Sequence, residues 1–202
     1  MRPLTKLTKN FSLKTAGPPA QPSESPRLRS VRWLKSTVLR ADPNRMATDP
    51  IRPTDDEARA LARTLIDGAQ FGALGVLNEG APMVTRIAVA TDADGCPLTL
   101  ISDLSHHTKC LRLNPTASLL LGEPGPRGDP LTHPRLTLAV QATFVEKTQS
   151  RTDRYLAHQP KAKLYITFAD FHFVRLAPID AHLNGGFGKA FKLSHSDLQS
   201  LR

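Results

Sequence analysis

The hydrophobic residues change their spacing at Phe71, and this change limits the chain to a mostly β fold. Before Phe71, apolar residues recur at helical intervals from Ala58 to Ile66, which predicts one helix with a single apolar face. Thr54 to Glu57 match a capping box that begins this helix, and Gly68 can end it. After Phe71 the apolar segments shorten to strand length and are separated by turn residues.

Strands and short helices follow one another through the rest of the chain. Turn residues at 78–80 and 92–95 separate strands, and Asn114-Pro115 ends a short helix. The predicted strands are Phe71–Leu77, Met83–Ala90, Leu98–Ile101, Ala117–Leu121, Arg135–Val145, Phe171–Leu176 and Ala181–Leu183, with helices at Ser105–Leu113 and Thr148–His158 and a long loop at Gly122–Pro134. About six strands with helices at the edges indicate a small closed or nearly closed β-barrel, which leaves few strand edges exposed.

The positive charge of the chain is concentrated in its first 45 residues. They contain 10 of the 27 Lys and Arg residues and 2 of the 18 acidic residues, a net charge of +8 out of +9. Several prolines and no sustained apolar period predict that residues 1–45 are disordered. Residues 50–202 form the predicted folded domain, and its near-neutral charge predicts neither a nucleic acid nor a membrane as partner.

Three interpretations of residues 1–45 stay open. The segment is basic and carries serines, as transit peptides are, although its prolines interrupt any amphipathic helix. It could also be a nucleic-acid-binding arm, or an extension upstream of a natural start at Met46. The sequence has no apolar run long enough to span a membrane. Because Cys96 and Cys110 form no CxxC pair, they are predicted to be reduced thiols of a cytoplasmic protein.

The junction from Ser102 to Lys109 is the most informative segment for function. It follows a predicted strand, begins a predicted helix, and contains hydroxyls, two imidazoles and an ammonium group. Free N–H groups at a helix N-terminus favour a phosphate. The alternative is an ordinary Ser-capped helix with a solvated lysine. His106 and His107 are adjacent, so at most one of them is expected to face a ligand.

Two arginines and a glycine cluster extend this hypothesis. Arg86 lies within an otherwise apolar strand, and a buried guanidinium there would need an anionic partner, whereas an outward-facing one would not. Arg135 has the same two interpretations. The glycines of 185–188 lack the third glycine of a dinucleotide fingerprint. They allow close approach of a ligand or subunit, or simply form a turn. No metal-ligand spacing, GxSxG elbow or P-loop occurs, which argues against metal sites, hydrolases and NTPases.

Five segments together resemble one known family. They are Phe71-Gly72-Ala73-Leu74, Ile101-Ser102-Asp103-Leu104 with His107-Thr108-Lys109, Pro134-Arg135-Leu136-Thr137-Leu138, Phe168-Ala169-Asp170-Phe171 and Gly185-Gly186-Phe187-Gly188. In order and spacing the chain resembles the pyridoxamine 5'-phosphate oxidase-like FMN-binding split barrels, in the branch that contains haem-utilisation proteins. The resemblance covers about residues 50–192. It implies a six-stranded split barrel that forms a homodimer with two FMN sites at the subunit interface.

The resemblance also implies site residues and an activity. The implied FMN-binding set is Arg86, Ser102, His107, Thr108, Lys109 and Arg135, with Arg86, Thr108 and Lys109 as the principal contacts. The implied function is an FMN-dependent oxidoreductase that acts on a small-molecule substrate. A flavin-binding module without turnover is one alternative. Another is a haem-binding or haem-degrading protein on the same barrel, for which His195 is a candidate haem ligand because this branch can use a histidine near the C-terminus.

Overall fold

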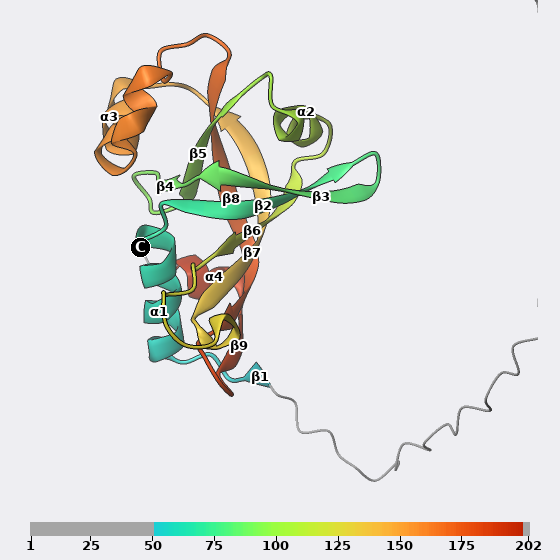
Figure 1. Cartoon of the computed structure of the whole chain (residues 1–202), viewed down its shortest axis with the longest axis vertical. Coiled ribbons are helices and arrows are strands. Elements are labelled where there is room, and N and C mark those ends of the chain that lie inside the picture. Colours follow the sequence, from blue (N-terminus) through green and yellow to red (C-terminus); the bar gives the residue numbers. More distant parts are fainter. Residues whose placement is uncertain (1–50, 200–202) are drawn as a thin grey trace, which may run out of the picture. The chain divides into compact units, whose positions relative to one another are not determined.

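The computed structural model describes residues 51–199 and contains a mostly β domain with helices at its edges (Figure 1). Its strands are β1 (Ile51–Arg52), β2 (Phe71–Asn78), β3 (Ala81–Ala88), β4 (Ala90–Thr91), β5 (Pro97–Ser102), β6 (Thr116–Leu121), β7 (Arg135–Val145), β8 (Phe171–Asn184) and β9 (Ala190–Leu193). Its helices are α1 (Asp56–Asp67), α2 (His106–Leu113), α3 (Gln149–His158) and α4 (His195–Gln199), with short 3-10 turns η1 (Pro130–Thr132) and η2 (Pro160–Leu164). The mostly β, split-barrel fold class is confirmed, whereas the predictions for residues 1–45 and for Met46 lie outside the described residues.

All nine strands of the described region belong to one sheet. The sheet has two walls: one is the main run of seven strands, and the other is formed by β4, β5 and the first part of β8. Strand β8 therefore belongs to both walls. The main strand order is β1-β9-β8-β7-β6-β2-β3, and β5 pairs with β4 and with the first part of β8, from Phe171 to Arg175. The second part of β8, from Ala181 to Asn184, pairs with β9. Near the β4 end the two walls are joined by β4 and by Thr99, whose hydroxyl donates to the Ala88 carbonyl at 2.7 Å. No ladder pairs β3 with β5 directly.

The core follows from the alternation of side chains along the strands. Leu74, Val76 and Leu119 point into the barrel and are 3 % exposed or less. Helix α1 covers this core with the buried face that its spacing predicted, formed by Ala58, Ala62 and Ile66. The buried side chains at these positions hold the sheet around one continuous apolar cluster.

The start of α1 differs from the predicted capping box. Asp55 is the N-cap, and its carboxylate accepts a hydrogen bond from the Ala58 N–H at 2.7 Å. The hydroxyl of Thr54 instead donates to the Lys192 carbonyl at 2.9 Å. Thr54, Asp55 and Asp56 are all residue types that favour the N-cap position. The hydrogen bond from Thr54 to Lys192 of β9 takes Thr54 out of this role, and Asp55 caps the helix. The C-cap at Gly68 agrees with the prediction.

The last long strand also differs from its prediction. The two expected strands Phe171–Leu176 and Ala181–Leu183 are one continuous strand, β8. Pro178 interrupts the sequence pattern, but the register shifts between Ala139 and Val140 of β7, so that Ile179 is left as an extra residue. A β-bulge of this kind accommodates a proline inside a ladder. The short strands β1, β4 and β9 were not predicted and account for the larger strand count.

A charged network ties the turn after β4 to α3 and β8. The Asp92 carboxylate is 6 % exposed and accepts hydrogen bonds from Arg151 at 3.1 Å and Arg175 at 2.8 Å, and Arg175 also contacts Asp94 at 2.8 Å. Burial by itself raises the pKa of Asp92, but hydrogen bonds from Arg151, the Ala93 N–H and Arg175 outweigh burial and lower it. The same carboxylates raise the pKa of Arg175.

Candidate functional site

The junction between β5 and α2 is held by hydrogen bonds within the protein. The Ser102 hydroxyl donates to Asp170 Oδ2 at 2.6 Å and accepts from the Leu104 N–H at 3.0 Å. The hydroxyl of Thr108 is fully buried and donates to the Ser102 carbonyl at 2.7 Å. Both hydroxyls therefore shape the junction, and neither points outward as a ready donor to a ligand.

His107 is the residue of the junction that has a buried ring nitrogen, Nε2, without a hydrogen-bond partner among the described residues. Burial, followed by the charge of the neighbouring His106, lowers the pKa of His107. Adjacent His106 instead contacts the Asn78 side chain at 3.0 Å. The expectation that at most one of the two histidines faces a ligand stays a prediction.

Lys109 and Arg86 are both exposed cations. Lys109 lies on the outer surface of α2. β4 pairs with β5, with Ala90 opposite Leu98. Four residues back from Ala90 is Arg86 on β3, and four residues forward from Leu98 is Ser102. If the register of this ladder is continued, Arg86 falls opposite Ser102.

Arg86 makes one described side-chain contact, with an aromatic ring. Its guanidinium lies 5.2 Å from the centre of the Phe71 ring, and within residues 51–199 it has no ion pair. The outward-facing interpretation of Arg86 is thus the correct one. An exposed guanidinium beside an aromatic face is a suitable partner for a flat anion.

Two adjoining hollows surround Phe71, and we call them together the Phe71 groove. One has a volume of about 310 Å³ and lies between the end of α1 and the exit of β6. The other has a volume of about 170 Å³ and includes Arg86 and Leu120. Phe71, Gly122 and Glu123 line both hollows. A Cβ on Gly122 would lie 2.5 Å from the Pro134 carbonyl oxygen, and its φ is +96°, so this glycine is needed for the shape of the groove.

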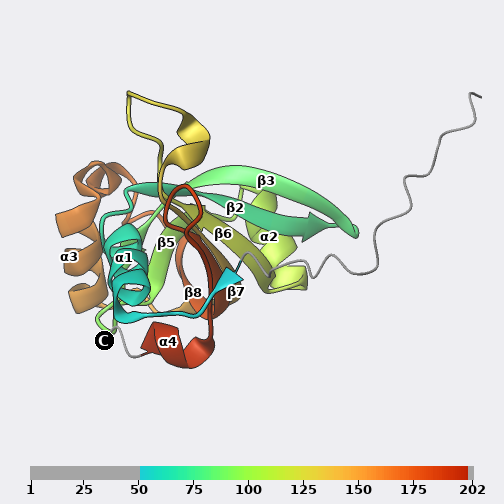
Figure 2. The same cartoon turned by 90° about the horizontal axis from the view of Figure 1, so that it is seen from below.

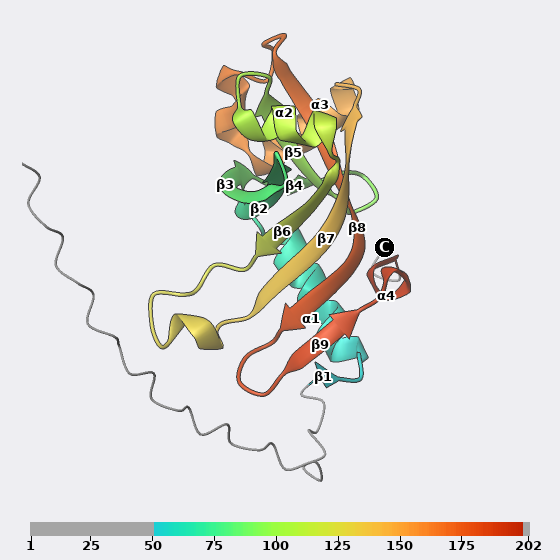
Figure 3. The same cartoon turned by 90° about the vertical axis from the view of Figure 1, so that its right-hand side faces the viewer.

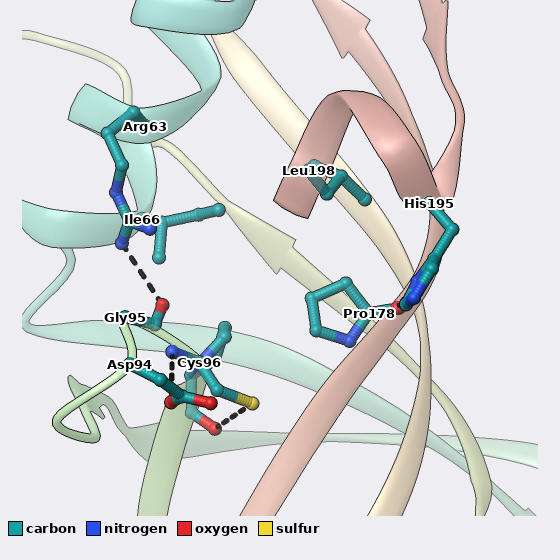
Figure 4. Close-up of a pocket in the computed structure, with 9 residues that line it drawn as sticks. Arg63, Ile66, Asp94, Gly95, Cys96, Pro178, His195 and Leu198 are labelled. Atoms are coloured by element: carbon teal, nitrogen blue, oxygen red, sulfur yellow. Dashed lines mark hydrogen bonds between the residues drawn. The ribbon is translucent and has the colours of Figure 1, made fainter. Parts of the chain in front are cut away.

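The remaining two predicted site residues are engaged elsewhere. Arg135 donates to the Leu131 carbonyl at 2.8 Å, although its backbone borders Gly122 of the groove. His195 donates from Nδ1 to the Pro178 carbonyl at 3.0 Å, the arrangement that orients metal-binding histidines. The cavity that it lines holds only about 30 Å³ (Figure 4). Haem cannot enter it, so a haem bound to His195 would lie on the solvent side.

Sequence reasoning did not single out Phe71 and Asp170 as site residues. Both stand in the segments that carry the family resemblance, so the signal was present without an assigned role.

The Asp170 carbonyl also accepts the Asp103 N–H at 2.8 Å. Asp103 in turn accepts from Arg112 and His172, each at 2.7 Å, and these two contacts lower its pKa.

We expect Asp170→Ala to lower the free energy of unfolding by about 1.5 kcal/mol, because it leaves the buried Ser102 hydroxyl without its acceptor. Urea denaturation measures the change. A double-mutant cycle with Ser102→Ala isolates the contact between the two side chains. A coupling energy near zero would show that this bond does not hold the junction.

Among residues 51–199, no cluster of three or more His, Cys, Asp or Glu side chains is placed to hold a metal ion. The described helices are all too short or too polar to cross a membrane.

The fold is a split β-barrel that carries exposed cations and the Phe71 groove on its surface. The family model named CREG, beta-barrel, matches residues 53–199. The chain belongs to this family, and the predicted split-barrel relationship is confirmed.

Named relatives agree with this assignment. The chain is 38% identical over 135 residues to the chloroplastic haem oxygenase HOZ of Arabidopsis thaliana, a match that covers 64% of this chain and 40% of HOZ. A haem-binding protein from Mycobacterium smegmatis is 27% identical with a TM-score of 0.66, covering 74% of this chain and 62% of that one. ChuZ from Campylobacter jejuni, at 19% identity, shares the fold with a TM-score of 0.64 and coverage of 74% and 63%. The chain thus spans less than two thirds of each of these relatives.

Proposed function

We propose that the protein binds haem as a substrate and takes part in its oxidative breakdown. The observation that carries this proposal is the 38% identity to the haem oxygenase HOZ over 135 residues. The 27% identity to a haem-binding protein supports it. The chain spans 40% of HOZ, so functions of the remaining part of that relative are not transferred.

The Phe71 groove offers apolar contact and one cation to a flat anionic ligand, and Glu123 also lines both of its hollows. The aromatic ring of Phe71 and the aliphatic Leu120 offer apolar contact, and Arg86 offers a charge for a propionate. Ligand sites are usually concave, mostly apolar, and equipped with a few polar groups. These features support haem at the groove, with the ring beside Phe71.

FMN is the second candidate, and a specific observation favours it. The buried Nε2 of His107 has no described partner, and the ammonium of Lys109 is exposed nearby on the same helix. The exposed cations Lys109 and Arg86 are suited to the phosphate of a nucleotide cofactor, whereas His107 lies on another face of the helix from Lys109. When bound, FMN would supply hydride or electron transfer. Ser102, Thr108 and Arg135 would then act by shaping the site, because their side chains bond within the protein.

A second copy of the chain is the proposed partner of the outer sheet face. Leu77, Val84 and Leu120 all point away from the core and are 40%, 70% and 40% exposed. They lie on the neighbouring strands β2, β3 and β6, beside the Phe71 groove. An exposed apolar patch of this kind is typical of a subunit interface. We therefore propose a homodimer, for which the mass measured in solution should be twice that of one chain.

An absorption spectrum of the full-length protein decides between the two cofactors. We expect added haem to give a shifted Soret band that saturates at one haem per chain. Under air, a chemical reductant such as ascorbate should then cause loss of the band, with bovine serum albumin carrying haem as the control. A flavin band pair in the protein as isolated, with no Soret shift on titration, would overturn the haem proposal in favour of FMN.

A further inference from the structure

The smaller hollow of the Phe71 groove contains one cation and one anion. Arg86 and Glu123 both line it, together with Phe71 and Leu120. Both charged side chains are exposed, and neither has an ion pair within residues 51–199. Glu123 also lines the larger hollow. A ligand in this groove therefore meets charges of both signs.

The register of the sheet places Arg86 on the floor of the smaller hollow. Ala73 of β2 lies opposite Arg86 of β3 on one side and opposite Leu120 of β6 on the other. Residues that lie opposite one another in neighbouring strands point to the same face of a sheet, so these three form one row. The small side chain of Ala73 leaves space between the guanidinium and the Leu120 side chain.

Glu123 stands where the chain leaves the sheet after β6. Gly122 before it has a φ of +96°, and a Cβ there would lie 2.5 Å from the Pro134 carbonyl oxygen, so this backbone is restrained. Pro124 after it has a fixed φ and also restricts the conformation of Glu123. Figure 2 shows the yellow loop that begins here standing out from the sheet, and Figure 3 shows it joining the ends of β6 and β7. The carboxylate is therefore carried by a restrained part of the loop.

The position of Glu123 bears on which ligand the groove accepts, and this step rests on the proposed binding of haem there. The two propionates of haem stand on neighbouring pyrrole rings, at one edge of the macrocycle. A haem that places one propionate at Arg86 brings the other to the same edge, where Glu123 lines the hollow. Carboxylates at close range repel each other. A ligand with one carboxylate on that edge gains the attraction of Arg86 without this repulsion.

We infer that Glu123 makes the Phe71 groove selective for a flat macrocycle that carries one carboxylate on its bound edge. Arg86 binds that carboxylate, the ring lies beside Phe71, and Glu123 disfavours a second carboxylate. Specificity commonly combines an attractive group with a repulsive one in this way. The preferred substrate class is a tetrapyrrole monocarboxylate, and haem with its two propionates binds more weakly.

Two simpler roles for Glu123 predict different measurements. As an ion-pair partner of Arg86 in the free protein, Glu123 would compete with every ligand carboxylate and weaken all anionic ligands by the same factor. As a solvated surface residue, it would weaken none of them. The ratio of two affinities separates selectivity from both roles, because competition for Arg86 cancels in the ratio.

Titration of the full chain at the Soret band, with haem and with haem monomethyl ester, measures this ratio. We expect the unaltered protein to bind the monoester roughly three- to fivefold more tightly at low ionic strength, the size of one exposed charge contact. Added salt should reduce the preference. Glu123→Gln removes the charge but keeps the shape, so it should bind both porphyrins equally and unfold at the urea midpoint of the unaltered protein. Glu146→Gln is the matched control, since Glu146 is an exposed glutamate after β7, and it should keep the original ratio.

Three results would overturn the inference. A ratio near one in the unaltered protein, or a ratio that Glu123→Gln leaves unchanged, would do so while haem binding itself stands. An equal gain in affinity for both porphyrins in Glu123→Gln would assign Glu123 to competition for Arg86. If neither porphyrin shifts the Soret band, the haem proposal fails and this inference fails with it.

Discussion

Asp92→Ala should lower the free energy of unfolding by about 3 kcal/mol, the largest loss expected from a single substitution in the charged network. Removing this carboxylate leaves Arg151 and Arg175, which are 19% and 26% exposed, without their shared buried partner. Breaking a buried pair by deleting one member costs about 3 to 5 kcal/mol, and partial exposure of the arginines places this case at the lower end. Thermal denaturation should show a midpoint lower by roughly 10 °C.

The same carboxylate makes stability depend on pH. The pKa of Asp92 is lower in the folded protein than its usual value of 3.8. Its contribution is therefore fully present above that usual value and is lost as the pH falls through the folded pKa. The acid side of a plot of unfolding free energy against pH should flatten in Asp92→Ala relative to the unaltered protein.

Asp153→Ala is the matched control, since Asp153 is an exposed aspartate on α3. We expect it to change the unfolding free energy by less than about 0.5 kcal/mol. If Asp92→Ala and Asp153→Ala unfold at the same urea concentration, the network does not contribute to stability in the way its geometry indicates.

Arg86→Ala should weaken haem binding by roughly 10- to 100-fold, the size of one lost charge-assisted contact of about 1.5 to 3 kcal/mol. The side chain is exposed, so the fold should tolerate the change. Arg86→Lys keeps the charge but loses the planar contact with Phe71, and we expect it to restore part of the affinity. Titration followed at the Soret band measures all three proteins.

Two further variants complete that experiment. Arg154→Ala is the control for haem binding, and Lys109→Ala tests FMN binding. Arg154 is an exposed arginine on α3, and its removal should leave haem affinity unchanged. Lys109→Ala should weaken FMN binding if the nucleotide phosphate sits at the β5–α2 junction. Equal haem affinity in Arg86→Ala and the unaltered protein would place the ligand away from the Phe71 groove.

Most elements of the fold could be predicted because they depend on local patterns. The apolar spacing of Ala58, Ala62 and Ile66 gave α1 its buried face, and Thr148 caps α3 as a residue of its type should. Choices that depend on distant residues could not be predicted. The Lys192 carbonyl accepts the hydrogen bond of the Thr54 hydroxyl. A bulge in the ladder between β7 and β8 allows β8 to continue past Pro178.

The candidate site shows the same division. Residue types at 102–109 predicted a phosphate site or an ordinary Ser-capped helix, and in the structure Ser105 is the N-cap of α2 but its side chain makes no capping hydrogen bond. Which groups face outward depends on packing, since Asp170 takes the Ser102 hydroxyl from a position far along the chain. The Phe71 groove could not be predicted, because its walls come from α1, β2 and the segment after β6, which are brought together only by the barrel.

The shared strand β8 sets the order in which the barrel can be completed during synthesis. The strands from β2 to β7 pair with one another, but β5, which pairs with β4, has a second partner, β8, that is made later. Leu98 pairs with Arg175, so the second wall stays open until most of the domain has left the ribosome. Closing so long a loop carries an entropic cost, which makes this step a natural late stage of folding. Until then, the edge of β5 that later pairs with β8 stays unpaired.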